Sequence, residues 1–144
     1  MKRLLYLLII VFLGSHTAES QVINDQVSKC AMSAGPGVTY LKDFRIQLGS
    51  GDKEAGLRYK GIFPMSKNMK YKFTLCTAEK SVGLLIMNIT DNSGRKLLSS
   101  YDPQSGKTFQ SVEFQCNKTG TYNINFDFMN HSSGSGIGII SLVR

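Results

Sequence analysis

One histidine, His131, lies after residue 20, and it is the side chain best suited to acid–base chemistry in that part of the sequence. Asp127 precedes it by four residues and Ser132 and Ser133 follow it, so the residue types of a Ser-His-Asp triad occur close together. The stretch 133–136 alternates Ser with Gly, which is typical of a flexible loop, and no Gly-x-Ser-x-Gly turn presents a nucleophilic serine. We therefore predict no catalytic residue and expect that the protein is not an enzyme.

Metal-binding and paired-carboxylate patterns are also absent from the sequence. Neither Cys-x-x-Cys nor His-x-x-x-His spacing occurs, so no zinc site is indicated. Asp52 and Glu54 lie in a glycine-rich loop without the ordered ligand spacing of a calcium loop, which favours solvation over metal binding. No two carboxylates are predicted to face each other across a cleft, as glycosidase chemistry requires. The sequence predicts no metal and no cofactor.

The three cysteines, Cys30, Cys76 and Cys116, allow one disulfide bond and one free thiol. Cys76 and Cys116 each end a predicted strand, so we expect these two to pair and Cys30 to be free. Strict alternation places Cys116 on the core face and Cys76 on the opposite face, and a bulge or a strand end is needed to reconcile the pair. The alternative is that both are small buried hydrophobic residues.

Tyrosines outside the predicted core are the remaining candidates for ligand binding. The chain has no Trp, the usual platform for stacking on sugars. Tyr40, Tyr59 and Tyr101 fall outside the clear core stripes, and tyrosines at loop ends are good binding anchors. Packing at the rim of the domain is the competing interpretation for each of them.

The N-terminus has the layout of a secretory signal peptide. A basic start is followed by an apolar run at residues 4–13, and Ala18 and Ser20 place small side chains before a cut at Gln21. Spanning a bilayer takes about 20 apolar residues, roughly twice the length of this run, so cleavage of residues 1–20 is favoured over anchoring. We predict an exported protein, located in the periplasm, at the cell surface or outside the cell, with no transmembrane span after cleavage.

Positive charge is the main bias of the composition. The chain has 17 basic and 10 acidic residues, and removal of residues 1–20 leaves a net charge of +6. Only the segment from Arg58 to Lys72 is densely basic. Lysines on the solvent face of strands prevent edge-to-edge aggregation, which is favoured here over binding to a polyanion. Nucleic acid is therefore not an expected partner.

Alternating apolar and polar residues predict a β-rich domain over residues 38–144, after a lead-in segment at 21–37. Residues 69–75 and 121–128 alternate most clearly, and turn residues recur about every 8 to 12 positions. A short strand is predicted from Leu57 to Phe63, ended by Pro64. The nearly continuous apolar run Val82–Thr90 is typical of a central strand covered on both faces. No 12-residue segment has convincing helical periodicity, so we predict an antiparallel, jelly-roll-like β-sandwich of seven to eight strands.

Three stretches within residues 69–144 share short motifs with one family. They are the Tyr-x-Phe strand at Tyr71–Leu75, the strand, Asp-x-x-Gly turn and return strand at Met87–Leu98, and the Gly-Thr-Tyr strand at Thr119–Ile124. Together they resemble the bacterial pre-peptidase C-terminal (PPC) domain, a jelly-roll sandwich. The resemblance implies an accessory domain of secreted peptidases that is sometimes free-standing, and some members bind calcium or matrix polymers. The form expected here is free-standing and without calcium, because no dense acidic cluster precedes the first strand.

These patterns favour one function and leave two alternatives. The leading hypothesis is an exported, non-catalytic binding or accessory module for a protein or glycan ligand. The second is a structural envelope or surface component that assembles through an edge strand or a free cysteine. The third, a hydrolase with an unrecognised site, needs acidic residues gathered around His131.

Overall fold

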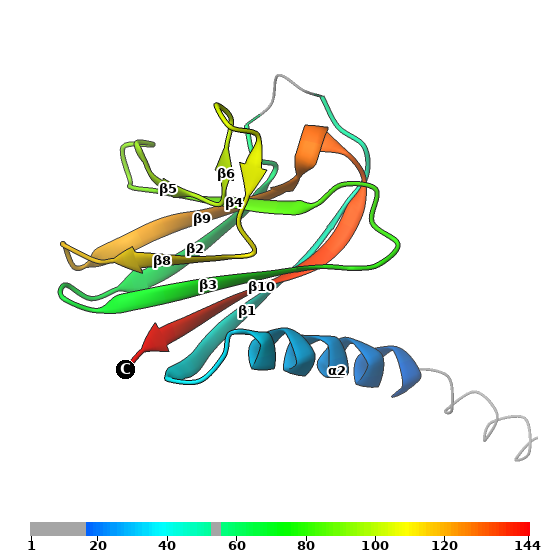
Figure 1. Cartoon of the computed structure of the whole chain (residues 1–144), viewed down its shortest axis with the longest axis horizontal. Helices are drawn as coiled ribbons and strands as arrows, with labels where there is room; N and C mark the ends of the chain where they lie inside the picture. Colours follow the sequence, from blue (N-terminus) through cyan, green and yellow to red (C-terminus); the bar gives the residue numbers. More distant parts are fainter. Residues whose placement is uncertain (1–16, 53–55) are drawn as a thin grey trace, which may run out of the picture.

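Two four-stranded antiparallel sheets packed face to face form the body of the computed structural model, which describes residues 17–52 and 56–144 (Figure 1). In chain order the elements are α2 (Thr17–Ser33), β1 (Val38–Leu48), β2 (Tyr59–Met65), β3 (Lys70–Thr77), β4 (Leu85–Thr90), β5 (Lys96–Ser99), β6 (Tyr101–Asp102), β7 (Lys107–Thr108), β8 (Ser111–Gln115), β9 (Gly120–Phe128), the 3₁₀ turn η1 (Met129–His131) and β10 (Gly134–Val143). Sheet A has the order β1-β10-β3-β8, and sheet B has the order β2-β9-β4-β5. The predicted β-rich architecture with antiparallel sheets is confirmed.

The core lies between the sheets and is built by period-two alternation. Phe73 and Leu75 of β3 face Ile124, Phe126 and Phe128 of β9, and all five side chains are almost completely buried. Alternate residues of these strands point outward, as the pleat of a strand requires. The outward row of β9 therefore carries polar side chains, and the sandwich places that row on the outer surface of sheet B.

The chain passes repeatedly from one sheet to the other, which brings distant segments together. β2 pairs with β9, and β1 pairs with β10. The loop between β1 and β2 and the loop between β9 and β10 consequently meet at one end of the sandwich, which lies to the right in Figure 1. The short ribbon of β6 and β7 connects sheet B back to sheet A.

The bounds of β4 and β2 differ from the sequence prediction, and β2 begins at Tyr59 rather than at Leu57. β4 begins at Leu85 rather than at Val82, and Val82 and Leu84 are 78% and 55% exposed in the preceding loop. β2 does not end at Pro64 but includes it. Proline is tolerated there because β2 is an edge strand and pairs only with β9.

A helix occupies much of the region predicted to be a lead-in segment without a long helix. α2 lies against the outer face of sheet A, as Figure 1 shows, and packs Val27, Cys30 and Ala31 on Ile137 and Ile139. The sequence did not predict this helix because the apolar face that it packs on the sheet is short and made of small side chains. Residues 1–16 of the predicted signal peptide lie outside the described residues, and the predicted cut falls inside α2. No helix among the described residues has the length and apolarity that crossing a membrane needs.

The disulfide bond joins Cys30 of α2 to Cys76 of β3, with the two Cα atoms 5.9 Å apart, and Cys116 is the free cysteine. The predicted pairing of Cys76 with Cys116, with Cys30 free, is therefore wrong. The physical reason is strand alternation: Cys76 lies on the outer face of sheet A beneath α2, whereas Cys116 belongs to the core and is completely buried. No bulge rotates Cys76 into the core, because the register of β3 with β10 is regular through Cys76.

This arrangement predicts a specific thiol count. The native protein should react with no equivalent of Ellman's reagent, because the Cys116 side chain is sealed in the core and the other two sulfurs are bonded. Denaturation without reductant should expose one thiol per chain, and denaturation with reductant should expose three. A labelled thiol that maps to Cys30 after denaturation without reductant contradicts the arrangement.

Candidate functional site

The three tyrosines predicted to contact a ligand are on three different elements. Tyr40 of β1 is 47% exposed and its hydroxyl donates a hydrogen bond to Asp43 Oδ1 at 2.6 Å. Tyr59 of β2 packs edge-on against the rings of Phe44 and Phe126, as part of the core. Tyr101 is half-buried in β6. The structure does not bring them together on one surface.

Asp127 forms a buried polar cluster where the loops meet. Its side chain has no exposed surface, and the Arg58 side chain is 16% exposed. The Arg58 guanidinium donates to Asp127 Oδ1 at 2.7 Å, and the backbone N–H groups of Arg58 and Phe128 donate to the same carboxylate at 3.1 and 2.7 Å. Nδ1 of His131 lies 2.9 Å from Asp127 Oδ2. The carboxylate is thus surrounded by donors, as a buried charge requires.

The electrostatics of Asp127 favour its ionised form. Burial acts to raise the pKa of Asp127, but the hydrogen bonds from Arg58 and from the Phe128 N–H outweigh it, so the pKa is lowered from its ordinary value. Arg58 also donates to the carbonyl oxygens of Gly49 and Ser132. The pair therefore ties the β1–β2 loop to the β9–β10 loop. We call Arg58, Asp127 and His131 the loop anchor.

The same geometry argues against a hydrolytic role for His131. Both oxygens of Asp127 already accept hydrogen bonds from Arg58. Ser132, adjacent in sequence, contributes its carbonyl oxygen to Arg58, and within residues 17–52 and 56–144 its hydroxyl makes no hydrogen bond to His131. His131 and Arg58 thus share one buried carboxylate, an arrangement that accounts for the position of His131 without a nucleophile beside it.

A hollow lies on the outer face of sheet B. It has a volume of about 420 Å³. Strands β9 and β4 form its floor and β2 forms one side. Gly56 and Leu57, which directly precede Arg58 in the sequence, form one end. The lining residues are mostly uncharged: Gly56, Leu57, Lys60, Gly61, Ile62, Asn88, Thr90, Gly94, Asn123 and Asn125. We call this hollow the amide groove.

Strand register explains how the amide groove acquires its floor. Asn125 stands opposite both Lys60 and Asn88, and Asn123 stands opposite both Ile62 and Thr90. Asn125 is nearly buried, and its Nδ2 donates to Asn88 Oδ1 at 2.9 Å and to Thr90 Oγ1 at 3.3 Å. These bonds fix the orientation of the amides, so the groove presents its polar groups in a defined arrangement.

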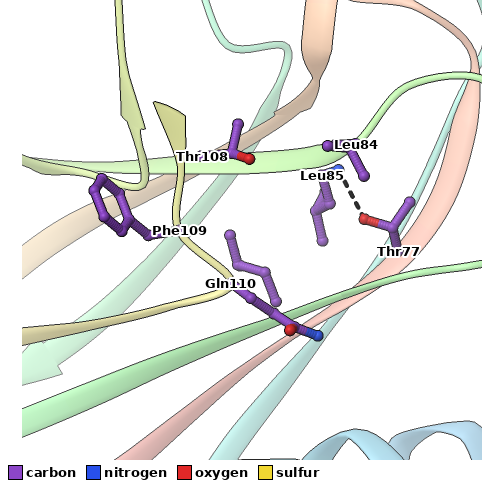
Figure 2. A pocket seen from close by; sticks show the side chains of 7 residues that line it. Thr77, Leu84, Leu85, Thr108, Phe109 and Gln110 are labelled. Carbon is purple, nitrogen blue, oxygen red and sulfur yellow. Dashed lines mark hydrogen bonds between the residues drawn. The ribbon is translucent and has the colours of Figure 1, made fainter. Parts of the chain in front are cut away.

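A second, smaller cleft of about 340 Å³ opens where β5 and β8 end short of β4 and β3. Figure 2 shows Leu85 and Gln110 between the strands, Thr77 at one side and Phe109 at the other. The Leu85 N–H donates to Thr77 Oγ1 at 2.9 Å. Phe109 and Leu84 at its mouth are 48% and 55% exposed. We call it the end cleft.

Within the described part of the chain, no group of three or more His, Cys, Asp or Glu side chains is placed to hold a metal ion. Asp52 and Glu54, weighed in the sequence as weak calcium ligands, do not lie in a described cluster, and Glu54 is outside the described residues.

Sequence patterns indicated part of this site and not the rest. The alternation of β9 already places Asn123, Asn125 and Asp127 on one outward face. The pairing of Asp127 with Arg58, 69 residues away, has no local signal. No protein-family model matches the chain, and no curated protein matches it in a sequence search.

Proposed function

We propose that the protein is an exported, non-catalytic binding module and that its ligand lies in the amide groove. One observation carries the proposal. The outer face of sheet A is covered by α2, whereas the outer face of sheet B has a groove of about 420 Å³ lined by oriented amides and a hydroxyl. Ligand sites are concave, largely pre-formed and equipped with a few oriented polar groups.

The proposed export is supported by the disulfide bond. Disulfides persist in oxidising compartments and are rare in the cytosol of most organisms. Cys30 and Cys76 belong to separate elements, so their bond is a structural staple rather than a closely spaced redox pair. Together with the signal-like N-terminus, this supports a location in the periplasm, at the cell surface or outside the cell.

The proposed resemblance to the PPC domain is supported by strand order. Without β6 and β7, the sandwich of the described chain has eight strands, which can be numbered one to eight in chain order. One sheet then has the order 1-8-3-6 and the other 2-7-4-5, which is a jelly-roll arrangement. An accessory role follows from that resemblance only as part of this proposal, since a shared fold does not specify a ligand.

The alternative of self-assembly has less support. The free cysteine, Cys116, is completely buried and has no route to a second chain in the folded state. β1 is a long edge strand, but a register shift between Tyr40 and Lys42 interrupts it, and charged side chains follow. Both features discourage pairing between edges.

A pair of matched surface variants tests the proposal. Ile62 is 61% exposed at the groove, and Met32 is 72% exposed on α2, on the opposite side of the molecule. We expect Ile62→Glu to reduce retention of the fluorescently labelled exported protein on envelope and extracellular material of the source cells at least tenfold. This is because the new carboxylate must lose water of hydration when a ligand covers it. Met32→Glu should bind like wild type.

The comparison of Ile62→Glu with Met32→Glu separates specific binding in the groove from non-specific adhesion. If Ile62→Glu binds as well as the wild type, the amide groove is not the site. If a Phe109→Ser variant loses binding while Ile62→Glu retains it, the end cleft takes the place of the groove. Both replaced side chains are exposed, so circular dichroism should show unchanged folding for each variant.

A further inference from the structure

We infer that the amide groove takes an uncharged, hydroxyl-rich ligand, namely a stretch of neutral oligosaccharide. This inference rests on the proposed binding function and names the ligand class for the same groove. It depends on two properties of the lining: the hydrogen-bonding character of its floor and its near-neutral charge.

The floor offers both donors and acceptors. With Asn125 bonded to Asn88 Oδ1 and Thr90 Oγ1, the amide hydrogens of Asn88 and the hydroxyl hydrogen of Thr90 have no partner among the described residues. Asn123 donates to the Asp91 carbonyl at 3.3 Å, and its own oxygen has no partner in the described chain. A sugar hydroxyl donates and accepts at once, so a row of mixed donors and acceptors suits it.

The charge of the lining fits a neutral ligand better than an anionic one. Lys60 is the only charged side chain among the ten lining residues. An anionic polymer is bound by several cations whose counterions are released, and one lysine does not provide that. Lys60 can instead serve as a threefold donor at the rim, opposite Asn125.

A protein partner is disfavoured by what the lining lacks. Protein interfaces are centred on buried aromatic and arginine anchors, and none of the residues that line the groove is of that kind. The apolar contribution is limited to Ile62 and Leu57, at the side and the end of the groove. Such small patches suit the C–H faces of a sugar ring above a polar floor.

The groove is also held ready for its ligand. Gly56 and Leu57 form one end, and the next residue, Arg58, is fixed by its ion pair with buried Asp127. The three strands beneath the groove span about 10 Å, since neighbouring strands lie about 4.8 Å apart. A pre-formed surface of this kind binds without first ordering a loop.

Chemical stripping of the binding material distinguishes the ligand classes. Mild periodate cleaves the vicinal diols of sugars, and proteinase K removes proteins. Groove-dependent retention is the part of the retention that Ile62→Glu abolishes. We expect the exported wild-type protein to lose this part when the binding material has been treated with periodate and to keep it when the material has been treated with proteinase. Loss only after proteinase overturns the saccharide inference and leaves the binding function standing, whereas retention that never depends on Ile62 overturns the binding function itself.

Defined probes then test the charge and the contacts. Cellohexaose, maltohexaose and an N-acetylglucosamine hexamer are titrated beside a heparin hexasaccharide and gelatin. We expect at least one neutral hexamer to bind, with affinity changing less than twofold between 50 and 500 mM NaCl, since no ion pair is involved.

Thr90→Val should lower the affinity for that hexamer about three- to tenfold, the effect of one lost hydrogen bond, whereas Thr108→Val in the end cleft should not lower it. Binding of heparin or gelatin alone, or no effect of Thr90→Val, contradicts the inference.

Discussion

Replacing Asp127 by asparagine is expected to lower the free energy of unfolding by about 3–5 kcal/mol, the usual cost of breaking one partner out of a buried ion pair. The substitution keeps the shape of the side chain but removes its charge. The Arg58 guanidinium is then left largely buried without a counter-ion, beside the carbonyl oxygens of Gly49 and Ser132. Urea denaturation of the protein at pH 7 measures the loss.

The control for this substitution is Asp91→Asn. Asp91 also has a lowered pKa, first because of its hydrogen bond from Ser93, and it pairs with Arg95 at 3.1 Å. Arg95 is 76% exposed, however, so this pair belongs to the class of surface ion pairs that contribute little to stability. A loss for Asp127→Asn no larger than that for Asp91→Asn contradicts the role of the loop anchor.

A second variant separates loss of the pair from general damage. Arg58→Met combined with Asp127→Asn removes both charges and retains an apolar stem beside the loops. Replacing a buried pair by groups of similar volume is often close to neutral, so the double variant should recover part of the stability lost by Asp127→Asn alone. The difference between the two is the coupling free energy of the pair.

The pH dependence of stability should change in the same variant. Because the folded pKa of Asp127 is below the unfolded value of about 3.9, its contribution is present above that pH and is lost as the pH falls through the folded pKa. The stability difference between wild type and Asp127→Asn should therefore shrink steadily on acidification below about pH 4. A difference that stays constant down to pH 2 contradicts the assigned ionisation.

Strand periodicity predicted the sandwich because each strand carries its own signal. The alternation at 121–128 fixes which side chains enter the core, and β9 follows it from Tyr122 to Phe128. The same rule placed Cys76 on the face opposite to Cys116, which was a sound objection to the predicted disulfide. The pairing was wrong because strand ends were given more weight than side-chain direction.

The elements that were missed depend on contacts between distant segments. α2 has a stripe at Val27, Cys30 and Ala31, which Ala34 continues just after the helix, but these small side chains give little hydrophobic signal. The stripe becomes meaningful only against Ile137 and Ile139 of β10. Likewise, the outward polar row of β9 is covered by loops only at Asp127. The hydrogen bond that holds those loops there joins Asp127 to Arg58, which is 69 residues away in the sequence.

Removing the disulfide bond with the double variant Cys30→Ala/Cys76→Ala should lower the free energy of unfolding by about 4 kcal/mol, from the loop entropy of a bond that joins positions 46 residues apart. The helix that the bond holds has few other means of attachment. Its buried contacts come from small residues, and Lys72 Nζ donates to the Ala34 carbonyl at 2.7 Å. Urea denaturation at matched conditions measures the loss, and wild type treated with reductant should show a similar loss.

Hydrogen exchange shows where that loss is felt. Amides of α2 should lose protection in the double variant while amides of β9 in sheet B keep most of theirs, since among the described residues the core between the sheets is built from the strands and loops of the sandwich. The amide groove lies on the far side of the sandwich, so its ligand affinity should change less than twofold. If the protection of α2 is unchanged, the disulfide bond does not hold the helix in place. If β9 also loses protection and binding is lost, the helix and the sandwich fold as one unit.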